Sequence, residues 1–234
     1  MPSFILDFLF PKKCISCKKF GSYICDACFS SIEPFDQYVC PMCLKHSITG
    51  ETHPGCVTPF SLDGLICGVV YKGVMKKMIF RLKYSPYVLD IGTIMGEIAV
   101  DVLSQNELFS RVLSSHPIVV EVPLSSYKLK KRGYNQAEIL SKFLANELNI
   151  SFTKEILVRI KSTNPQFKLD KKERQKNVLG AFEINKKYKN ITKNKTVVLV
   201  DDLSTSCATL RECAKVLKRA GAKKVYGVTF AREL

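Results

Sequence analysis

The sequence predicts an α/β protein with a mainly parallel sheet flanked by helices, preceded by a small cysteine-rich module. Strand-like and helical patterns alternate from about residue 62 onward, as they do in βαβ units. Before that point, seven of the 10 cysteines fall between Cys14 and Cys56. We therefore expect a module over residues 1–61 and an α/β domain over residues 62–234.

The cysteines of the module come in pairs separated by two residues. Two thiolates at this spacing can hold one metal ion from a single tight turn, and two such pairs complete a tetrahedral zinc site. His53 stands three residues before Cys56 and supplies the missing ligand of a fourth pair. The eight predicted zinc ligands are Cys14, Cys17, Cys25, Cys28, Cys40, Cys43, His53 and Cys56.

The pairing of these ligands admits alternatives. In the simplest one, the first four ligands bind one zinc ion and the last four bind a second. An interleaved pairing stays open, and His46 competes with His53 because it lies three residues after Cys43. One or two zinc ions would be bound, in a structural role, since four protein ligands leave no position for water. Zinc would supply much of the folding free energy of the module, which has little core of its own.

Hydrophobic periodicity places the elements that follow. Apolar residues at positions 74, 75, 78, 79 and 82 predict an amphipathic helix over 74–84. The same reasoning predicts helices over 91–103 and 135–148, strands over 65–73 and 117–124, and short strands over 155–160 and 180–184. Near the N-terminus, residues 4–10 are expected to form a short helix on the body of the protein, with contact to a membrane surface as the alternative.

Charge limits the classes of partner. The chain has 36 basic and 21 acidic residues, a net charge of +15, which favours nucleic acids, phosphorylated metabolites or anionic membrane surfaces. No apolar run reaches the roughly 18 residues of a membrane-spanning helix. Lys12 and Lys13 follow the first apolar stretch instead of preceding it, unlike in a signal peptide. We therefore expect a cytoplasmic protein.

The stretch VVLVDDLSTSCATL, residues 197–210, combines features of a ligand site. Its continuous apolar run predicts a central strand that is covered on both faces. Apolar residues at 210, 213, 214 and 217 predict a helix that Gly221 ends, and a further strand follows. Ligands of such sheets bind beyond the carboxyl ends of the strands, where the loop from Leu203 to Thr209 would lie.

The residue types of this loop predict the chemistry of the ligand. Hydroxyl groups and the free N–H groups at a helix N-terminus would bind a phosphate dianion. The two acids at 201 and 202 would repel that phosphate, but they can accept hydrogen bonds from two neighbouring hydroxyl groups. A ribose 5-phosphate group meets both conditions.

The stretch resembles the signature for phosphoribosyl pyrophosphate (PRPP) of type I phosphoribosyltransferases. The motif order cysteine pairs, LKY, VPL, KKRGYNQA, NPQ…ERQKNVLGAF and VDDLSTSCAT is similar to that of the ComF family, whose members are tied to natural DNA competence. The resemblance implies the type I phosphoribosyltransferase fold with an N-terminal zinc finger. The chain departs from the family at Cys207, where a glycine would allow a positive φ and a close approach of the phosphate.

The resemblance also implies roles for individual residues. Asp201 and Asp202 would be the catalytic acids that hold the ribose. The remaining PRPP-binding positions would be Leu203, Ser204, Thr205, Ser206, Cys207, Ala208 and Thr209 for the 5-phosphate, and Ser125, Ser126, Lys128 and Arg132 for the pyrophosphate and its Mg²⁺. Residues 132–136 would begin the next helix, and a hood loop over the ligand would include Gln166, Lys171 and Arg174.

The function expected from this resemblance is PRPP binding combined with the handling or uptake of single-stranded DNA during natural transformation. The protein would be cytoplasmic, associated with the inner face of the membrane by peripheral contact, and competence-machinery proteins are further candidate partners. Whether it transfers a phosphoribosyl group is left open. The alternatives are a nucleobase phosphoribosyltransferase of salvage and a catalytically inert DNA-binding adaptor.

Overall fold

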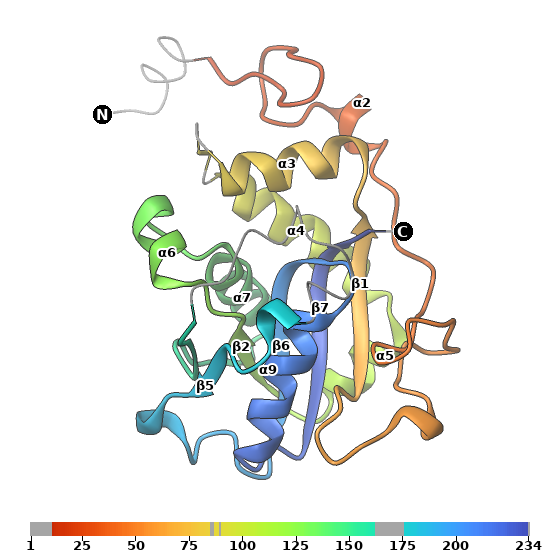
Figure 1. Cartoon of the computed structure of the whole chain (residues 1–234). Helices are drawn as coiled ribbons and strands as arrows, with labels where there is room; N and C mark the ends of the chain where they lie inside the picture. The colour runs from red at the N-terminus through yellow and green to blue at the C-terminus, as the bar shows by residue number, and fades with distance from the viewer. Residues whose placement is uncertain (1–10, 85–86, 89, 162–175, 234) are drawn as a thin grey trace.

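A computed structural model describes residues 11–84, 87–88, 90–161 and 176–233 (Figure 1). Five strands form one sheet in the order β1-β7-β6-β2-β3, and every neighbouring pair is parallel. They are β1 (Gly64–Val70), β2 (Ile118–Glu121), β3 (Ser151–Phe152), β6 (Thr196–Ser204) and β7 (Lys224–Arg232). The predicted α/β class with a mainly parallel sheet is confirmed.

Helices cover both faces of this sheet (Figure 1). Val198 and Val200 of β6 belong to a core shared with α3, α4 and α7, whereas Val197 and Leu199 belong to a second core shared with α9. This alternation buries both faces of the strand and explains its continuous apolar run. The helices are α3 (Gly73–Lys83), α4 (Asp90–Ser104), α5 (Glu107–Leu113), α6 (Ser126–Arg132), α7 (Gln136–Glu147) and α9 (Ala208–Arg219).

Two expected boundaries differ in the structure. β6 continues through both acids to Ser204, because its parallel ladder with β7 extends to the Ser204–Arg232 pair. The loop before α9 therefore spans 205–207 and not 203–209. Residues 132–136 do not begin one helix: Arg132 ends α6, Gly133 has a φ of 84°, and the Asn135 side chain caps α7 by accepting from Ala137 N.

The short strands β4 (Leu157–Arg159) and β5 (Phe182–Ile184) pair antiparallel in a separate two-stranded sheet, and a 3₁₀ turn, η3 (Lys186–Tyr188), follows. The predicted hood residues Gln166, Lys171 and Arg174 lie outside the described residues, as does the predicted helix over 4–10. Within the described ranges, no helix combines the length and the apolar run that a membrane crossing needs.

The cysteine-rich segment, with α2 (Asp26–Phe29) and η1 (Pro54–Cys56), packs against the α/β part. Pro34 and Glu51 form isolated β-bridges to residues of β1. Ile15 is buried in the first core and Phe35 in the second. In Figure 1 the first part of the segment lies above α3, and the rest runs down beside β1. The division at residue 61 stays a prediction, and the two parts share their hydrophobic cores.

Candidate functional site

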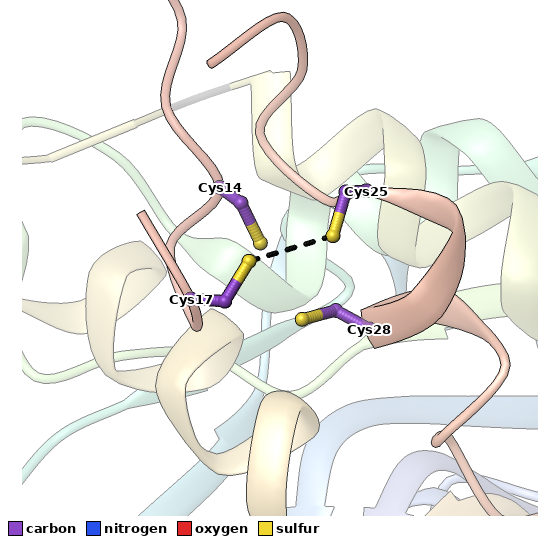
Figure 2. Close-up of side chains that lie close together, drawn as sticks. All are labelled: Cys14, Cys17, Cys25 and Cys28. Carbon is purple, nitrogen blue, oxygen red and sulfur yellow. Dashed lines mark hydrogen bonds between the residues drawn. The ribbon is translucent and has the colours of Figure 1, made fainter. Parts of the chain in front are cut away.

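Two clusters of candidate metal ligands lie in the N-terminal segment. The Sγ atoms of Cys14, Cys17, Cys25 and Cys28 are within 4.8 Å of one another, and Figure 2 shows them pointing to a common centre. Cys40, Cys43, His53 and Cys56 form the second cluster with the same limit. The eight side chains are thus grouped as the sequential pairing predicts and not as an interleaved pairing would require. The sulfurs of Cys17 and Cys25 are 3.5 Å apart, far beyond the roughly 2.05 Å of a disulfide.

The surroundings favour the thiolate form of one cysteine in each cluster, Cys14 and Cys40, while burial and neighbouring cysteines raise the pKa of Cys28 and Cys56. Burial acts against the Cys14 thiolate, but backbone N–H groups of Cys17, Cys25 and Ser16 lower the pKa of Cys14 to about 6. The second cluster repeats this arrangement, with the pKa of Cys40 lowered to about 7 despite burial. The thiolate-rich sets of four ligands fit zinc.

His53 is oriented by the backbone of the competing candidate His46. The His53 Nε2–H donates to the His46 carbonyl at 2.9 Å. Because a carbonyl only accepts, Nδ1 is left without a proton, and it lies 3.4 Å from the Cys43 Sγ. This is the second-shell bond that metal-binding histidines commonly make. His53 therefore lies with the second group of candidate ligands, and the main chain of His46 orients its ring.

The two adjacent acids of β6 have different environments. Successive side chains of a strand point to opposite faces. Asp202 lies on the face of α3 and α7, with only 2% of its surface exposed. Its Oδ1 accepts from Gln136 Nε2 at 3.1 Å, and its Oδ2 lies 2.5 Å from Lys83 Nζ. Asp201 is half-buried and its Oδ1 accepts the N–H of Asp202 at 2.8 Å.

Their pKa values shift in opposite directions. Burial by itself would raise the pKa of Asp202, but the Lys83 ammonium group outweighs burial and lowers it. Burial, followed by the charge of Asp202, raises the pKa of Asp201 well above its ordinary value. One carboxylate thus keeps its charge while its neighbour favours a proton, a division that carboxyl pairs in enzymes often show.

Cationic side chains from three elements surround this pair. Lys83 comes from α3, Lys128 and Arg132 from α6, and Arg159 from β4. Burial lowers the pKa of Lys128, and the charges of Arg159, Lys83 and Arg132 lower it further, so Lys128 lies within electrostatic reach of the other three. Arg132 also donates to the Gln136 side chain, which in turn donates to Asp202. Such a concentration of positive charge fits a ligand with several negative charges.

The loop after β6 adds a polar cluster in front of α9. Cys207, the N-terminal cap residue of α9, has φ 58° and ψ 9°, the left-handed conformation that glycine adopts most easily. Its buried Sγ lies 3.2 Å from Ser204 Oγ and 3.4 Å from a guanidinium nitrogen of Arg232. The same Arg232 nitrogen donates to Ser204 Oγ at 3.0 Å. The cysteine thus adopts a conformation in which glycine would carry less strain.

The other predicted binding residues are spread over this edge of the sheet. Ser125 is buried and caps α6 by accepting from Lys128 N at 3.4 Å, whereas Ser126 is exposed. The predicted 5-phosphate positions lie in three successive segments: Leu203 and Ser204 end β6, Thr205, Ser206 and Cys207 form the loop, and Ala208 and Thr209 begin α9.

A hollow of about 410 Å³ lies between the first cysteine cluster and α4, and it shares no residue with this edge of the sheet.

Sequence reasoning missed five residues at this edge. Lys83 could have been found, because it lies four residues after the buried Ile79 and so on the apolar side of α3. Arg232 likewise ends an apolar strand. For Gln136, Arg159 and Arg211, no local pattern in the sequence indicated a position near the two acids or the loop before α9. The missed residues are Lys83, Gln136, Arg159, Arg211 and Arg232.

Comparison with protein families matches two parts of the chain. Residues 133–233 match the phosphoribosyl transferase domain, and residues 5–68 match the double zinc ribbon domain. With the parallel sheet and the two ligand clusters, these matches define the class: a phosphoribosyltransferase-like α/β protein with an N-terminal zinc-binding segment.

Curated proteins with similar sequences have names that refer to competence and DNA utilization. Competence protein F of Haemophilus influenzae is 36% identical over 46% of each chain. The DNA utilization protein YhgH of Escherichia coli K12 is 26% identical over 80% of this chain and 87% of its own. Competence protein ComFC of Bacillus subtilis is 24% identical over 89% and 84%. These names agree with the resemblance to the ComF family that the sequence motifs indicated.

Some of these matches cover only part of the compared proteins or are distant, which limits the conclusions that they support. The matched stretch spans only 46% of the Haemophilus influenzae relative and 54% of the DNA utilization protein YhgH of Salmonella typhi, which is 31% identical. A solved structure, titled as the allosteric regulatory enzyme of purine biosynthesis, is 17% identical with a TM-score of 0.37, over 65% of this chain and 30% of that one. That likeness is too distant to carry an argument.

Proposed function

We propose that the carboxyl edge of β6 binds PRPP together with Mg²⁺. The observation that supports this most is the convergence of Lys83, Lys128, Arg132 and Arg159 around the pair of acids. In this arrangement the cations take the pyrophosphate group. The loop after Asp202 and the N-terminus of α9 take the 5-phosphate.

In this proposal Asp201 and Asp202 have different roles near the ribose. Asp202 keeps its charge through Lys83, and the more exposed Asp201 accepts a hydrogen bond from a ribose hydroxyl group. Bound Mg²⁺ would neutralise part of the charge of the pyrophosphate. If C1 of the ribose reacts, the cation cluster stabilises the charge that develops on the departing pyrophosphate. Our proposal is binding, because no residue in the described ranges points to an acceptor.

We further propose that the protein handles single-stranded DNA. The relatives' names refer to competence and to DNA utilization. A net charge of +15 exceeds what one small ligand requires and suits a polyanion. In this proposal the protein acts on the cytoplasmic side of the membrane, in peripheral contact with it and with competence-machinery proteins.

Calorimetry with PRPP and Mg²⁺ tests the proposed site. We expect binding by the native chain and its loss in the double variant Asp201→Asn, Asp202→Asn. Asp101→Asn, which changes an exposed acid on α4, is the matched control and should bind as the native chain does. No heat with the native, zinc-loaded chain would refute the proposal. Release of pyrophosphate on adding a nucleobase would instead favour a salvage enzyme.

A further inference from the structure

Helix α3 carries an exposed aromatic pair on its outer surface. Phe80 is 53% exposed and Tyr84, which follows the helix, is 44% exposed. Their ring centroids are 4.9 Å apart with an interplanar angle of 34°. The pair is not part of either hydrophobic core, since the apolar face of α3 is formed by Val74, Met75, Met78, Ile79 and Leu82.

Positive charge surrounds this pair. Lys76, Lys77 and Arg81 of α3 lie outside its apolar face, the helix has no acidic residue in its first turn, and its fourth cation, Lys83, is paired with Asp202. Lys77 lies three residues before Phe80, on the same face of the helix. Lys76 is exposed beside it. Two partly exposed aromatic rings and several cations along one helix form a surface for a polyanion that also carries flat groups.

The first zinc-ligand cluster extends this basic surface. Lys77 Nζ donates to the carbonyl and the hydroxyl oxygen of Ser16, both at 3.2 Å. Ser16 lies between the ligands Cys14 and Cys17, so α3 is joined directly to this cluster. The same segment exposes Lys18, Lys19 and Phe20, the last 63% exposed with the Lys13 ammonium 4.6 Å from its ring centroid. In Figure 1 the segment lies against the outer side of α3.

We infer that this surface, which we call the α3 platform (Lys76, Lys77, Phe80, Arg81 and Tyr84), binds single-stranded DNA. The cations contact the phosphates, and unpaired bases stack on the two rings. A duplex offers no free base faces, so the rings favour a single strand. Two rings are also far less apolar surface than the roughly 800 Å² per partner of a stable protein interface. This inference rests on the DNA-handling part of the proposed function and locates it.

The test uses the full, zinc-loaded chain and a fluorescently labelled oligothymidylate. Fluorescence anisotropy should give binding at least about tenfold weaker for the double variant Phe80→Ala, Tyr84→Ala, since each lost stacking contact commonly costs a factor of this size. Phe60→Ala is the matched control. Phe60 is also an exposed phenylalanine, with the Arg219 guanidinium 5.2 Å from its ring, but it lies outside the platform. Its removal should leave affinity unchanged.

A second variant separates charge from stacking. Lys76→Gln should lower the slope of the logarithm of affinity against the logarithm of salt concentration by about 0.7, the value for one phosphate contact on a single strand. Zinc content, thermal unfolding and PRPP binding should stay native in both variants, because the changed side chains lie outside the cores and the phosphoribosyl site.

Three results would overturn the inference. Native affinity of the folded double variant for the oligonucleotide would show that DNA binds elsewhere, while the rest of the proposed function stands. A double variant that loses binding only to phosphatidylserine vesicles would assign the platform to a membrane surface. A native chain that binds PRPP but no oligonucleotide would remove both this inference and the DNA-handling part of the proposal.

Discussion

Lys83 holds the charge of Asp202 in a largely buried ion pair, with side-chain exposures of 20% and 3%. Replacing one partner of such a pair leaves the other charge buried without compensation. We therefore expect Lys83→Met to lower the free energy of unfolding by about 3 kcal/mol, measured by urea denaturation. Lys76→Met changes an exposed lysine of the same helix and should shift it by less than about 0.5 kcal/mol. Equal effects of the two changes would contradict this role for the pair.

For Asp201 we expect that removing the charge stabilises the protein at neutral to basic pH. Its pKa is raised on folding, so the folded state binds this proton more tightly than the unfolded state does. Its contribution to stability is therefore most favourable at acidic pH and is lost as pH rises through the folded pKa. Asp201→Asn cannot titrate, and its side-chain oxygen can still accept the N–H of Asp202. At pH 8 the variant should be more stable than the native chain, by an amount on the order of 1 kcal/mol.

Asp202→Asn should instead lower the stability of the protein at pH 8. A lowered pKa contributes stability that is present above the unfolded value and lost as pH falls through the folded pKa. Denaturation of the native chain and both variants at pH 5 and pH 8 measures the two differences, and the comparison cancels the titration of the zinc ligands. The pair of predictions fails if both variants shift stability in the same direction at pH 8.

At the scale of elements, Arg211 joins the second zinc-ligand cluster to the loop before α9. Its Nε donates to the Pro41 carbonyl at 2.6 Å, and Pro41 lies between Cys40 and Cys43. A second guanidinium nitrogen donates to the Ser206 carbonyl at 2.9 Å. One planar side chain thereby positions both segments, a geometry that a lysine ammonium group cannot reproduce.

Arg211→Met should loosen both segments. Hydrogen exchange measured by mass spectrometry should become faster over residues 40–43 and 204–207, while the zinc content stays native. Affinity for PRPP should fall severalfold, because the loop is no longer held in place. Arg219→Met, at the other end of α9, is the control and should leave both readouts unchanged. Unchanged exchange in the Arg211 variant would show that the two bonds do not position the loop.

Sequence patterns predicted most elements because periodicity is a local property. The strand from 197, the helix over 74–84 and the two short strands all lie where the pattern placed them. The end of β6 was misplaced because the ladder with β7 continues through polar residues, and that pairing is not visible in β6 alone. α6 was missed because its basic residues give no apolar periodicity.

At the scale of the whole molecule, the zinc-binding segment is part of the same hydrophobic cores as the sheet. Ile15 packs in the core of α3, α4 and α7, and Phe35 packs in the core of α9. Arg232, at the loop before α9, lies with its guanidinium 5.9 Å from the centre of the Phe35 ring. Loss of the metal should therefore reach the α/β part and its phosphoribosyl site.

Zinc removal tests this coupling. We expect chelation of zinc to lower the midpoint of thermal unfolding by at least about 10 °C, because several kcal/mol of metal-linked folding free energy are lost and each is worth about 2–4 °C at this chain length. Calorimetry should show one cooperative transition with and without chelator. A separate transition of the segment, with the remaining chain unchanged, would mean that the two parts fold independently.

The sequence by itself determined the class of fold, the eight candidate zinc ligands and the place of the two acids at the end of a central strand. Each of these follows from spacing within a short window: a period of two or 3.6 residues, or two residues between ligands. Only the tertiary structure decided the pairing of the zinc ligands and the partners of Asp202. Gln136 lies 66 residues from that acid and Lys83 lies on another helix, and no local pattern encodes which distant side chains a fold brings together.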